Sequence, residues 1–236
     1  MNAPKPIPLQ WDRETLNRFW SYYSGTPELY FSYSKGADVV RRCGSLLKSG
    51  VRVMDYGCGP GYLLRHLIRT GCEVWGGDFS EDVVGKAGHD IIGVPNFRGI
   101  HTISSLLGSE QFDVVFLLEV IEHLDDAALD ETMGNINQLL RRGGRLVVTT
   151  PNDERLEESI VYSPVANVTF HRWQHVRSWS SVSLSSFLQR RGYDPVVSAV
   201  NFRDSNESIS LRNRIGRFLR DRFEKPAGLY AVATKL

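Results

Sequence analysis

The hydrophobic pattern of residues 51–150 alternates between strand-sized apolar runs and segments with helical spacing. Strands are predicted at 51–56, 73–77, 97–100, 112–118 and 145–150, and helices at 62–69, 80–87 and 125–141. Gly143 and Gly144 are expected to end the last of these helices. The continuously apolar run 112–118 is typical of a strand that is buried on both faces. Strands that alternate with helices predict a parallel sheet with right-handed crossovers.

The segments on either side of this region differ from it. Helices are predicted at 13–23 and 35–48, ahead of the alternating part, and a helix at 182–190 with strands at 193–200 and 229–234 after it. Six aromatic residues lie between positions 20 and 33. They either pack this segment onto the domain or cover a ligand as a lid. The sequence predicts an N-terminal helical cap (1–48) on a main domain (49–236).

Composition adds few constraints. With 236 residues and 42% hydrophobic residues, the chain is large enough for one well-packed domain. Its 28 basic and 27 acidic residues give a net charge of +1, which disfavours general attraction to nucleic acid. The three cysteines have neither C-x-x-C nor zinc-ribbon spacing, which favours reduced thiols. No signal peptide or membrane-length apolar run is apparent, so the expected localisation is cytoplasmic.

A glycine-rich turn follows the first buried strand and opens a predicted helix. Gly57, Gly59 and Gly61 have the spacing G-x-G-x-G, whereas dinucleotide sites use G-x-G-x-x-G and phosphate loops end in G-K-[ST]. Pro60 also removes a backbone N–H that a pyrophosphate would use. The turn therefore favours a nucleotide-like ligand without phosphates and disfavours a nicotinamide dehydrogenase.

Two acidic residues stand at the ends of the first two predicted strands. Asp78 can accept hydrogen bonds from the hydroxyls of a ribose, as an acid at this position does in dinucleotide-binding folds. Asp55 can face an ammonium group. The two acids and the glycine turn together predict a ligand that has both a ribose and a cationic amine.

Four sequence blocks resemble the class I S-adenosylmethionine-dependent methyltransferases over about residues 50–200. They are V-M-D-Y-G-C-G-P-G, G-G-D-F-S, F-D-V-V-F-L-L-E-V-I-E-H-L and L-L-R-R-G-G-R-L-V-V-T-T-P-N, in family order. The resemblance implies an α/β fold with a doubly wound, Rossmann-like sheet of seven mostly parallel strands, the last antiparallel. It also implies S-adenosylmethionine as cofactor, bound by Asp55, Gly57, Cys58, Gly59, Gly61, Asp78, Phe79 and Glu119. Gly99-Ile100-His101 departs from the family's Gly-Asp, which leaves the adenine contact open.

Candidate catalytic residues follow the fourth predicted strand in the run E-V-I-E-H. If a helix begins there, Glu119, Glu122 and His123 lie on one face of it. Two carboxylates and an imidazole suit Mg²⁺ or Mn²⁺, which would lower the pKa of an acceptor hydroxyl and position it. Two alternatives remain: His123 and Glu122 act in catalysis without a metal, with His123 as general base, or Glu119 only helps to bind the donor.

A later H-x-x-x-W-[ST] pattern, which begins at His175, extends this cluster. The combined pattern resembles the small-RNA 2′-O-methyltransferases and implies a metal held by Glu119, Glu122, His123 and His175. His171 is the less favoured candidate, and a loop hydrogen bond is the alternative role for His175. The E-x-x-E-H run also resembles the quinone-biosynthesis O-methyltransferases, whose acceptor is a catechol-like ring. Both kinds of acceptor carry adjacent hydroxyls that one metal can chelate.

Three functions are therefore weighed for the chain. A small hydroxylated acceptor, such as a quinol, polyphenol or sugar, fits best, and RNA 2′-O-methylation is the second hypothesis. The third is a catalytically silent donor-binding partner protein. A basic amphipathic stretch at 211–223 either touches a membrane or an anionic substrate, or is a solvated surface helix. The sequence does not decide the oligomeric state.

Overall fold

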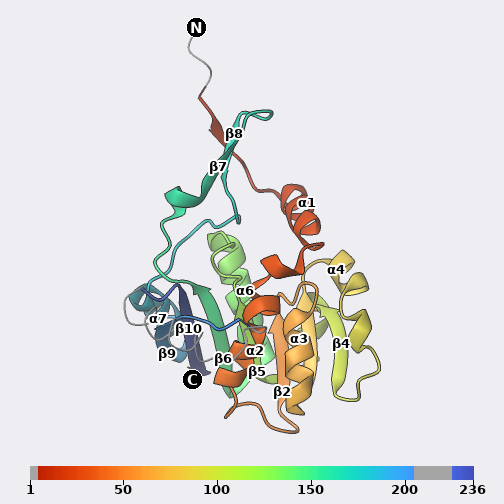
Figure 1. Cartoon of the computed structure of the whole chain (residues 1–236). Coiled ribbons are helices and arrows are strands. Elements are labelled where there is room, and N and C mark those ends of the chain that lie inside the picture. The colour runs from red at the N-terminus through yellow and green to blue at the C-terminus, as the bar shows by residue number, and fades with distance from the viewer. Residues whose placement is uncertain (1–4, 205–224) are drawn as a thin grey trace, which may run out of the picture.

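A seven-stranded sheet forms the centre of the computed structural model, which describes residues 5–204 and 225–236 (Figure 1). Its strands are β2 (Arg52–Tyr56), β3 (Glu73–Asp78), β4 (Phe97–Thr102), β5 (Phe112–Leu118), β6 (Leu140–Pro151), β9 (Tyr193–Val200) and β10 (Gly228–Lys235). They lie in the order β4-β3-β2-β5-β6-β10-β9. Strands β2 to β6 pair in parallel, and β10 is antiparallel to both of its neighbours. The predicted fold class is confirmed.

Helices cover both faces of this sheet. They are α1 (Arg13–Tyr23), α2 (Phe31–Arg42), α3 (Tyr62–Leu67), α4 (Glu81–Lys86), α5 (Ile103–Leu106), α6 (Asp126–Leu139) and α7 (Ser181–Gln189). Short 3₁₀ turns occur at Pro27–Leu29, Ile68–Thr70, His89–Ile91 and Leu156–Ser159. Buried side chains of α2 and α3 belong to one apolar cluster, and those of α5, α6 and α7 belong to a second. The two clusters lie on opposite faces, as a doubly wound sheet requires.

Strand β5 contributes to both clusters. Val115 and Leu117 pack on the side of α6, whereas Val114 and Phe116 pack on the side of α3. None of these four side chains is more than 2% exposed. Successive residues from 114 to 117 therefore enter the two cores alternately. This explains the apolar run as a strand that is buried on both faces, as predicted.

A second, three-stranded sheet lies at one end of the first and was not predicted (Figure 1). It consists of β1 (Ile7–Pro8), β8 (Val168–His171) and β7 (Ile160–Ser163), with β8 in the middle. Strand β1 pairs with β8 in parallel, so Ile7 and Pro8 are paired with residues about 160 positions later in the sequence. Helix α1 follows β1 directly. The division into a cap and a main domain at residue 48 stays a prediction.

The connection from α6 to β6 differs from the prediction. The helix ends at Leu139, and Leu140 already pairs with Phe112 in the sheet. Gly143 and Gly144 therefore do not end the helix but lie within β6, where the pairing register shifts. The prediction was wrong because a glycine pair marks a backbone irregularity without specifying whether a helix or a strand contains it.

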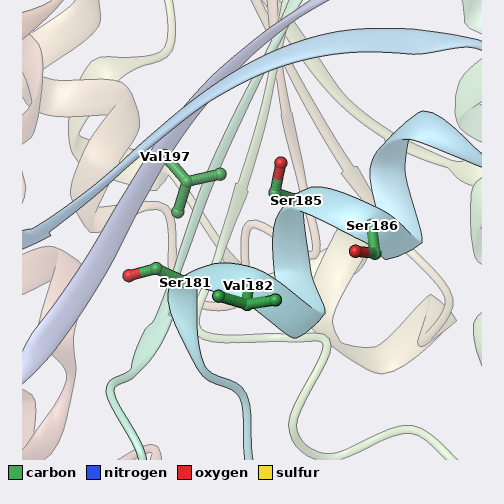
Figure 2. A pocket seen from close by; sticks show the side chains of 5 residues that line it. All are labelled: Ser181, Val182, Ser185, Ser186 and Val197. Carbon is green, nitrogen blue, oxygen red and sulfur yellow. The ribbon is translucent and has the colours of Figure 1, made fainter.

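Two further features lie outside the predicted catalytic and donor sites. A hollow between α7 and β9 is lined by Ser181, Val182, Ser185, Ser186 and Val197 (Figure 2). None of these residues belongs to a predicted site. The stretch 211–223 lies outside the described residues, and no described helix has the length and apolar character needed to cross a membrane.

Candidate active site

The loop between β2 and α3 places three glycines in left-handed conformations. Gly57, Gly59 and Gly61 have φ angles of 76°, 48° and 80°, which side chains with a Cβ rarely adopt. The N–H groups of Gly57 and Cys58 both donate to the carbonyl oxygen of Gly77, at 2.8 and 3.1 Å. The loop is thereby fixed to the end of β3, the neighbouring strand.

The two predicted acids lie together at these strand ends. Asp78 accepts the N–H groups of Gly59 (3.1 Å) and Ser80 (3.0 Å) through its two carboxylate oxygens. Asp55 is 4% exposed, and burial, followed by the charge of Asp78, raises its pKa to about 8. A cationic group placed beside a buried carboxyl group with such a raised pKa would strongly stabilise its ionised form. This fits the ammonium group of the predicted donor.

Aromatic rings stand on either side of the glycine loop. A Cβ atom on Gly59 would lie 3.7 Å from the Tyr30 ring. The Phe79 ring is 47% exposed and packs edge-on against Tyr56. Cys58 is buried, and burial raises the pKa of its thiol well above its usual value, so it is an inert wall residue. Contact of these side chains with the donor stays a prediction.

Glu119, Glu122 and His123 lie in a turn between β5 and α6. Glu119 has a φ of 52°, which is uncommon for a residue with a side chain. Helix α6 begins only after Asp125, whose carboxylate accepts the Ala128 N–H as a cap. The single helical face considered from the sequence is therefore wrong, because the capping aspartate starts the helix beyond His123.

This turn adjoins the glycine loop because β2 and β5 are neighbours in the sheet. Asp55 pairs with Phe116 across the two strands. A Cβ atom on Gly57 would come within 3.1 Å of a Val120 methyl group. The predicted donor site and the predicted catalytic residues thus lie side by side at the carboxyl ends of the strands, where open α/β sheets bind ligands.

Glu122 is a buried carboxyl group with one unsatisfied oxygen. It is 1% exposed, and its Oε2 accepts a hydrogen bond from the Thr150 hydroxyl at 2.9 Å. Oε1 has no hydrogen-bond partner among the described residues and lies 3.9 Å from His123 Nε2. Burial, then the charge of Glu119, raises the pKa of Glu122 well above its usual value. Buried oxygens are normally paired, so the free Oε1 indicates a ligand site.

The loop after β8 is joined to this turn. Hydrogen bonds to three backbone carbonyl groups of the turn connect them: Val176 N–H to the Glu122 carbonyl (2.8 Å), Gln174 Nε2 to the His123 carbonyl (2.9 Å), and Arg177 Nε to the Leu124 carbonyl (2.8 Å). Segments about 50 residues apart along the chain therefore share one rigid arrangement. This arrangement places the His175 ring next to the His123 ring.

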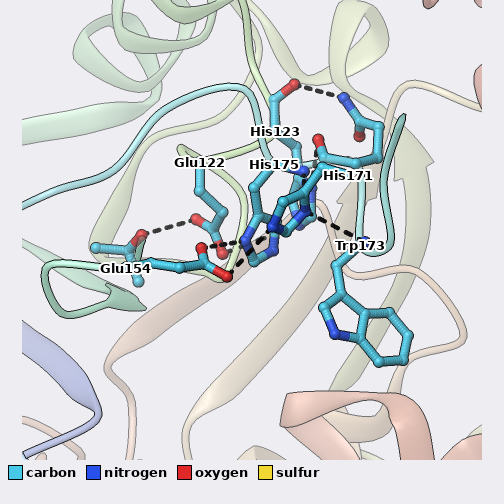
Figure 3. Close-up of polar contacts among 8 residues, drawn as sticks. Glu122, His123, Glu154, His171, Trp173 and His175 are labelled. Atoms are coloured by element: carbon cyan, nitrogen blue, oxygen red, sulfur yellow. Dashed lines mark hydrogen bonds and ion pairs between the residues drawn. The ribbon is translucent and has the colours of Figure 1, made fainter. Parts of the chain in front are cut away.

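Glu122, His123 and His175 come together, as the metal-ligand pattern predicted. Each offers one ligand atom, and the three atoms lie within 4.8 Å of one another. The rings of His123 and His175 stand edge to face, with centroids 4.8 Å apart. Glu154 and His171 adjoin them and form a second such group with His175 (Figure 3).

Glu119, the fourth predicted ligand, joins neither group of described residues. Burial is the main cause that raises its pKa to about 7. Its charge nevertheless acts on Glu122, so its carboxyl group is close to the cluster. Whether Glu119 serves the donor, a metal or both stays a prediction.

His123 is held as a neutral imidazole. Burial, then the proximity of His175, lowers its pKa to about 3. Its Nδ1 lies 3.4 Å from the Gln174 carbonyl oxygen, which can only accept a hydrogen bond. The proton of the neutral ring is therefore on Nδ1, and the lone pair of Nε2 faces Glu122. Neutral imidazole with a free lone pair is the form that binds metals and accepts protons.

Aromatic residues of the N-terminal segment contact this cluster. The Trp20 ring of α1 packs edge-on against His123, with centroids 5.1 Å apart. Tyr23 of the same helix contacts Trp173, with centroids 5.6 Å apart. Close by, a hollow between α1 and β8 is lined by Leu9, Trp11, Thr15, Arg18, Phe19, Tyr22, Tyr23 and Phe170. These contacts agree with both roles considered for the aromatic residues between positions 20 and 33, which were packing onto the domain and covering a ligand.

One site residue, Glu154, was missed from the sequence. Its Oε2 lies 2.5 Å from His175 Nδ1, and its Oε1 lies 3.4 Å from His171 Nε2. The available signal was its place just beyond the fifth predicted strand, at the edge of the sheet where ligands bind. Burial alone would raise the pKa of Glu154, but the hydrogen bond from His175 and the electrostatic influence of the His175 and His171 rings outweigh it and lower the pKa.

Comparisons with known proteins identify the family of the chain. A methyltransferase domain family matches residues 29–198. The ubiquinone biosynthesis O-methyltransferase of Roseobacter denitrificans is 33% identical over 158 residues, which cover 62% of this chain and 61% of that protein. That of Sinorhizobium medicae is 32% identical over 127 residues, 52% of this chain and 50% of that protein. The chain thus spans between half and two thirds of the length of these curated relatives.

Solved structures support the same fold. An S-adenosylmethionine-dependent methyltransferase from Archaeoglobus fulgidus has a TM-score of 0.59 at 20% identity, covering 95% of this chain and 100% of its own. The methyltransferase domain of bacterial CtHen1-C has a TM-score of 0.58 at 21% identity, covering 85% and 96%. At these identities the likeness is one of fold.

The strand order, the glycine loop and the acids beside it define a class I methyltransferase fold. The family match covers well over half of the chain, and the chain belongs to the methyltransferase domain family. The class expected from the glycine run, that of the S-adenosylmethionine-dependent methyltransferases, is confirmed.

Proposed function

We propose that the protein transfers a methyl group from S-adenosylmethionine to a hydroxyl oxygen of a small acceptor with adjacent hydroxyls, catechol-like or sugar-like. The observation that carries the proposal is the cluster of Glu122, His123 and His175 directly beside the glycine loop. A methyl donor with a sulfonium is already activated, so the enzyme has to align the acceptor and deal with its proton. The cluster offers groups for both tasks.

A divalent cation fits the cluster. Glu122 Oε1 is a buried carboxylate oxygen without a partner, and His123 Nε2 lies 3.9 Å from it with a free lone pair. His175 completes the group, in which each of the three residues has one ligand atom within 4.8 Å of the others. This donor set of oxygen and imidazole nitrogen suits Mg²⁺ or, better, Mn²⁺. Such a cation would lower the pKa of a hydroxyl that it coordinates.

The protein's own residues have distinct roles in this proposal. Asp55 neutralises the donor's ammonium group, and the glycine loop lets the backbone approach the donor's methionine part closely. Thr150 fixes one oxygen of Glu122, which leaves the other directed at the acceptor. When the acceptor oxygen attacks the methyl carbon, the carbon–sulfur bond breaks and its electrons stay on sulfur. In this proposal the hydroxyl proton goes to His123 Nε2 or Glu122 Oε1, which lie 3.9 Å apart.

The aromatic side chains beside the cluster favour an acceptor that carries a ring. Trp20, Tyr23 and Trp173 are here called the aromatic wall. Trp20 stands against His123, and Trp173 stands against Tyr23. A planar acceptor can stack on such side chains while its hydroxyls reach the cluster. The relatives named ubiquinone biosynthesis O-methyltransferases agree with this choice. A net charge of +1 argues against RNA as the acceptor.

The test is an assay of S-adenosylhomocysteine release over a panel of acceptors. The panel contains a catechol, a hydroquinone, a sugar and a short RNA with a free 3′-terminal diol. The protein is purified without chelators, its metal content is measured, and activity is compared before and after EDTA and after Mg²⁺ or Mn²⁺ is added back. E122Q is expected to lower kcat by about 10²–10⁴-fold, whereas E158Q, at an exposed ion pair with Arg155, leaves it unchanged.

Each outcome separates one part of the proposal. Turnover of the catechol that EDTA abolishes and Mn²⁺ restores supports all of it. Full activity in EDTA contradicts the metal but leaves O-methylation standing. Turnover of the RNA alone replaces the acceptor class. Donor binding without turnover of any acceptor favours the catalytically silent partner.

A further inference from the structure

Glu154 lies where two loops and a strand end meet. The segment after β6 is pinned there, because Asn152 forms a bridge with Trp179 and the Asp153 N–H donates to the Trp179 carbonyl at 2.7 Å. Asp153 has a φ of 49°, an uncommon conformation for a residue with a side chain. A backbone outlier held in place by its surroundings is often found next to a functional side chain. Here that side chain is Glu154.

The hydrogen bonds of His171 determine where its proton is. Its Nδ1 accepts the backbone N–H groups of Trp173 (3.3 Å) and His175 (3.1 Å). A backbone N–H can only donate, so Nδ1 is unprotonated and the neutral ring carries its proton on Nε2. Nε2 is buried, has no hydrogen-bond partner among the described residues, and lies 3.4 Å from Glu154 Oε1.

This tautomer excludes His171 as a metal ligand in the observed arrangement. A metal needs a lone pair on the ligating nitrogen. The lone pair of His171 Nδ1 is taken by two N–H groups, and Nε2 holds a proton. Glu154, His171 and His175 therefore form a contact chain rather than a second metal site: His175 is hydrogen-bonded to Glu154, and His171 Nε2 lies 3.4 Å from Glu154 Oε1.

His175 stands at the end of that chain. Its ring stacks on His171, with centroids 4.6 Å apart and planes inclined by 21°. Its Nδ1 lies 2.5 Å from Glu154 Oε2. A carboxylate can only accept hydrogen bonds, so Nδ1 of His175 carries the proton. When the ring is neutral, its lone pair is then on Nε2, the nitrogen that Glu154 leaves free. His175 also belongs to the group with Glu122 and His123.

We propose that Glu154, itself oriented by His171, fixes His175 in the Nδ1–H tautomer and so presents Nε2 to the acceptor site. Glu154 is thus a positioning residue, which rests on the proposed function of that site. Carboxylates that orient a ligating histidine in this way typically change metal affinity 10–100-fold when they are removed.

The substitution E154Q tests the proposal sharply because it preserves size and replaces one oxygen by an NH₂ group. The tautomer of His171 is pinned by two backbone groups, so its Nε2–H requires the remaining amide oxygen. The NH₂ group then faces His175 Nδ1, which has to become an acceptor. E154Q is therefore expected to shift the proton of His175 from Nδ1 to Nε2 while His171 keeps its proton on Nε2.

The readout is a long-range ¹H–¹⁵N correlation spectrum of the full chain with ¹⁵N-labelled histidine, recorded without metal under mildly alkaline conditions. The chain has six histidines, so single His→Gln variants assign the signals. E154A, which removes the acceptor altogether, is expected to give a mixture of both His175 tautomers. E158Q makes the same chemical change at an exposed carboxylate and should leave the spectrum unchanged. Mn²⁺ titrations of the same proteins should show 10–100-fold weaker binding to E154Q.

An Nδ1–H tautomer of His175 that persists in both E154Q and E154A overturns the proposal. Unchanged Mn²⁺ affinity of E154Q, with wild-type protein that binds Mn²⁺, overturns it as well. If E154Q does not fold, the E154A spectrum decides. If the wild-type protein binds no Mn²⁺ or methylates no acceptor, the proposed function fails, but the tautomer still decides the role of Glu154.

Discussion

Binding of the donor should release a proton from Asp55. This carboxyl group is 4% exposed, and burial together with neighbouring Asp78 raises its pKa to about 8. An ammonium group placed against it would favour the ionised form and return its pKa towards the ordinary value of about 3.9. S-adenosylhomocysteine carries the same amine as the donor and undergoes no reaction, so it is the suitable probe.

The size of the effect follows from the two pKa values. At about pH 6.5 a group with a pKa of 8 is roughly 97% protonated, and one with a pKa near 4 is almost fully ionised. Binding should thus release about one proton per ligand. The α-amino group of the ligand has an ordinary pKa of about 7.7–8.0 and stays mostly protonated at that pH, so it contributes little.

Isothermal titration calorimetry measures this proton directly. The observed enthalpy, plotted against the ionisation enthalpy of several buffers, should have a slope close to one proton released. D55N should weaken binding and remove the slope. D82N is the matched control, because Asp82 is exposed in an ion pair with Lys86. A wild-type slope near zero, or a slope that persists in D55N, would refute the assignment of Asp55 to the donor's amine.

The same pKa makes an independent prediction about stability without ligand. A folded-state pKa raised from about 3.9 to about 8 gives a contribution that is fully present below pH 4 and is lost as the pH rises to 8. By pH 7 the loss is on the order of 4 kcal/mol. D55N cannot ionise and should be more stable than wild type at pH 7 but not at pH 4. Urea denaturation at the two pH values measures the difference.

Three further substitutions test individual contacts by urea denaturation. T150V removes the hydrogen bond to the buried Glu122 carboxylate and should cost about 1–3 kcal/mol; no loss would show that the bond contributes nothing. Y193F removes a buried hydroxyl that has no partner among the described residues, so stability should stay equal or rise by about 1 kcal/mol. A clear loss would contradict that. S180A breaks the capping box with Ser183 and should cost about 1 kcal/mol, with an undiminished midpoint as the contrary result.

The main sheet could be predicted because its strands have a strong hydrophobic pattern. The run 112–118 was located to the residue, since all of its side chains except that of Asp113 pack into or against one of two cores. The small sheet gave no such signal. Ile160, Val161 and Tyr162 of β7 are exposed, and β1 is only two residues long and pairs with a strand far along the chain. Apolar periodicity reports burial, so it misses strands that bury little.

The proposed donor residues were easier to locate than the proposed acceptor residues for a related reason. Asp55 and Asp78 lie at the carboxyl ends of the adjacent strands β2 and β3, and parallel strands end at one edge of a sheet. His175 instead depends on a loop whose position is set by hydrogen bonds to the turn after β5. Only the family resemblance indicated it. Glu154 had no pattern of its own and became visible through its contacts with His175 and His171.

The proposed donor and acceptor residues thus lie on differently supported parts of the protein, which determines where substitutions would be tolerated. The donor acids are carried by strands whose register is fixed by two buried cores, so a change there disturbs the whole domain. The aromatic wall and the loop of His175 belong to α1 and to the segment after β8, which the small sheet and a few hydrogen bonds hold in place. Substitutions in these segments can alter the acceptor without loosening the donor site. Under the proposed function, acceptor specificity would thus depend on the part of the molecule that was hardest to predict from the sequence, and donor binding on the part that was easiest.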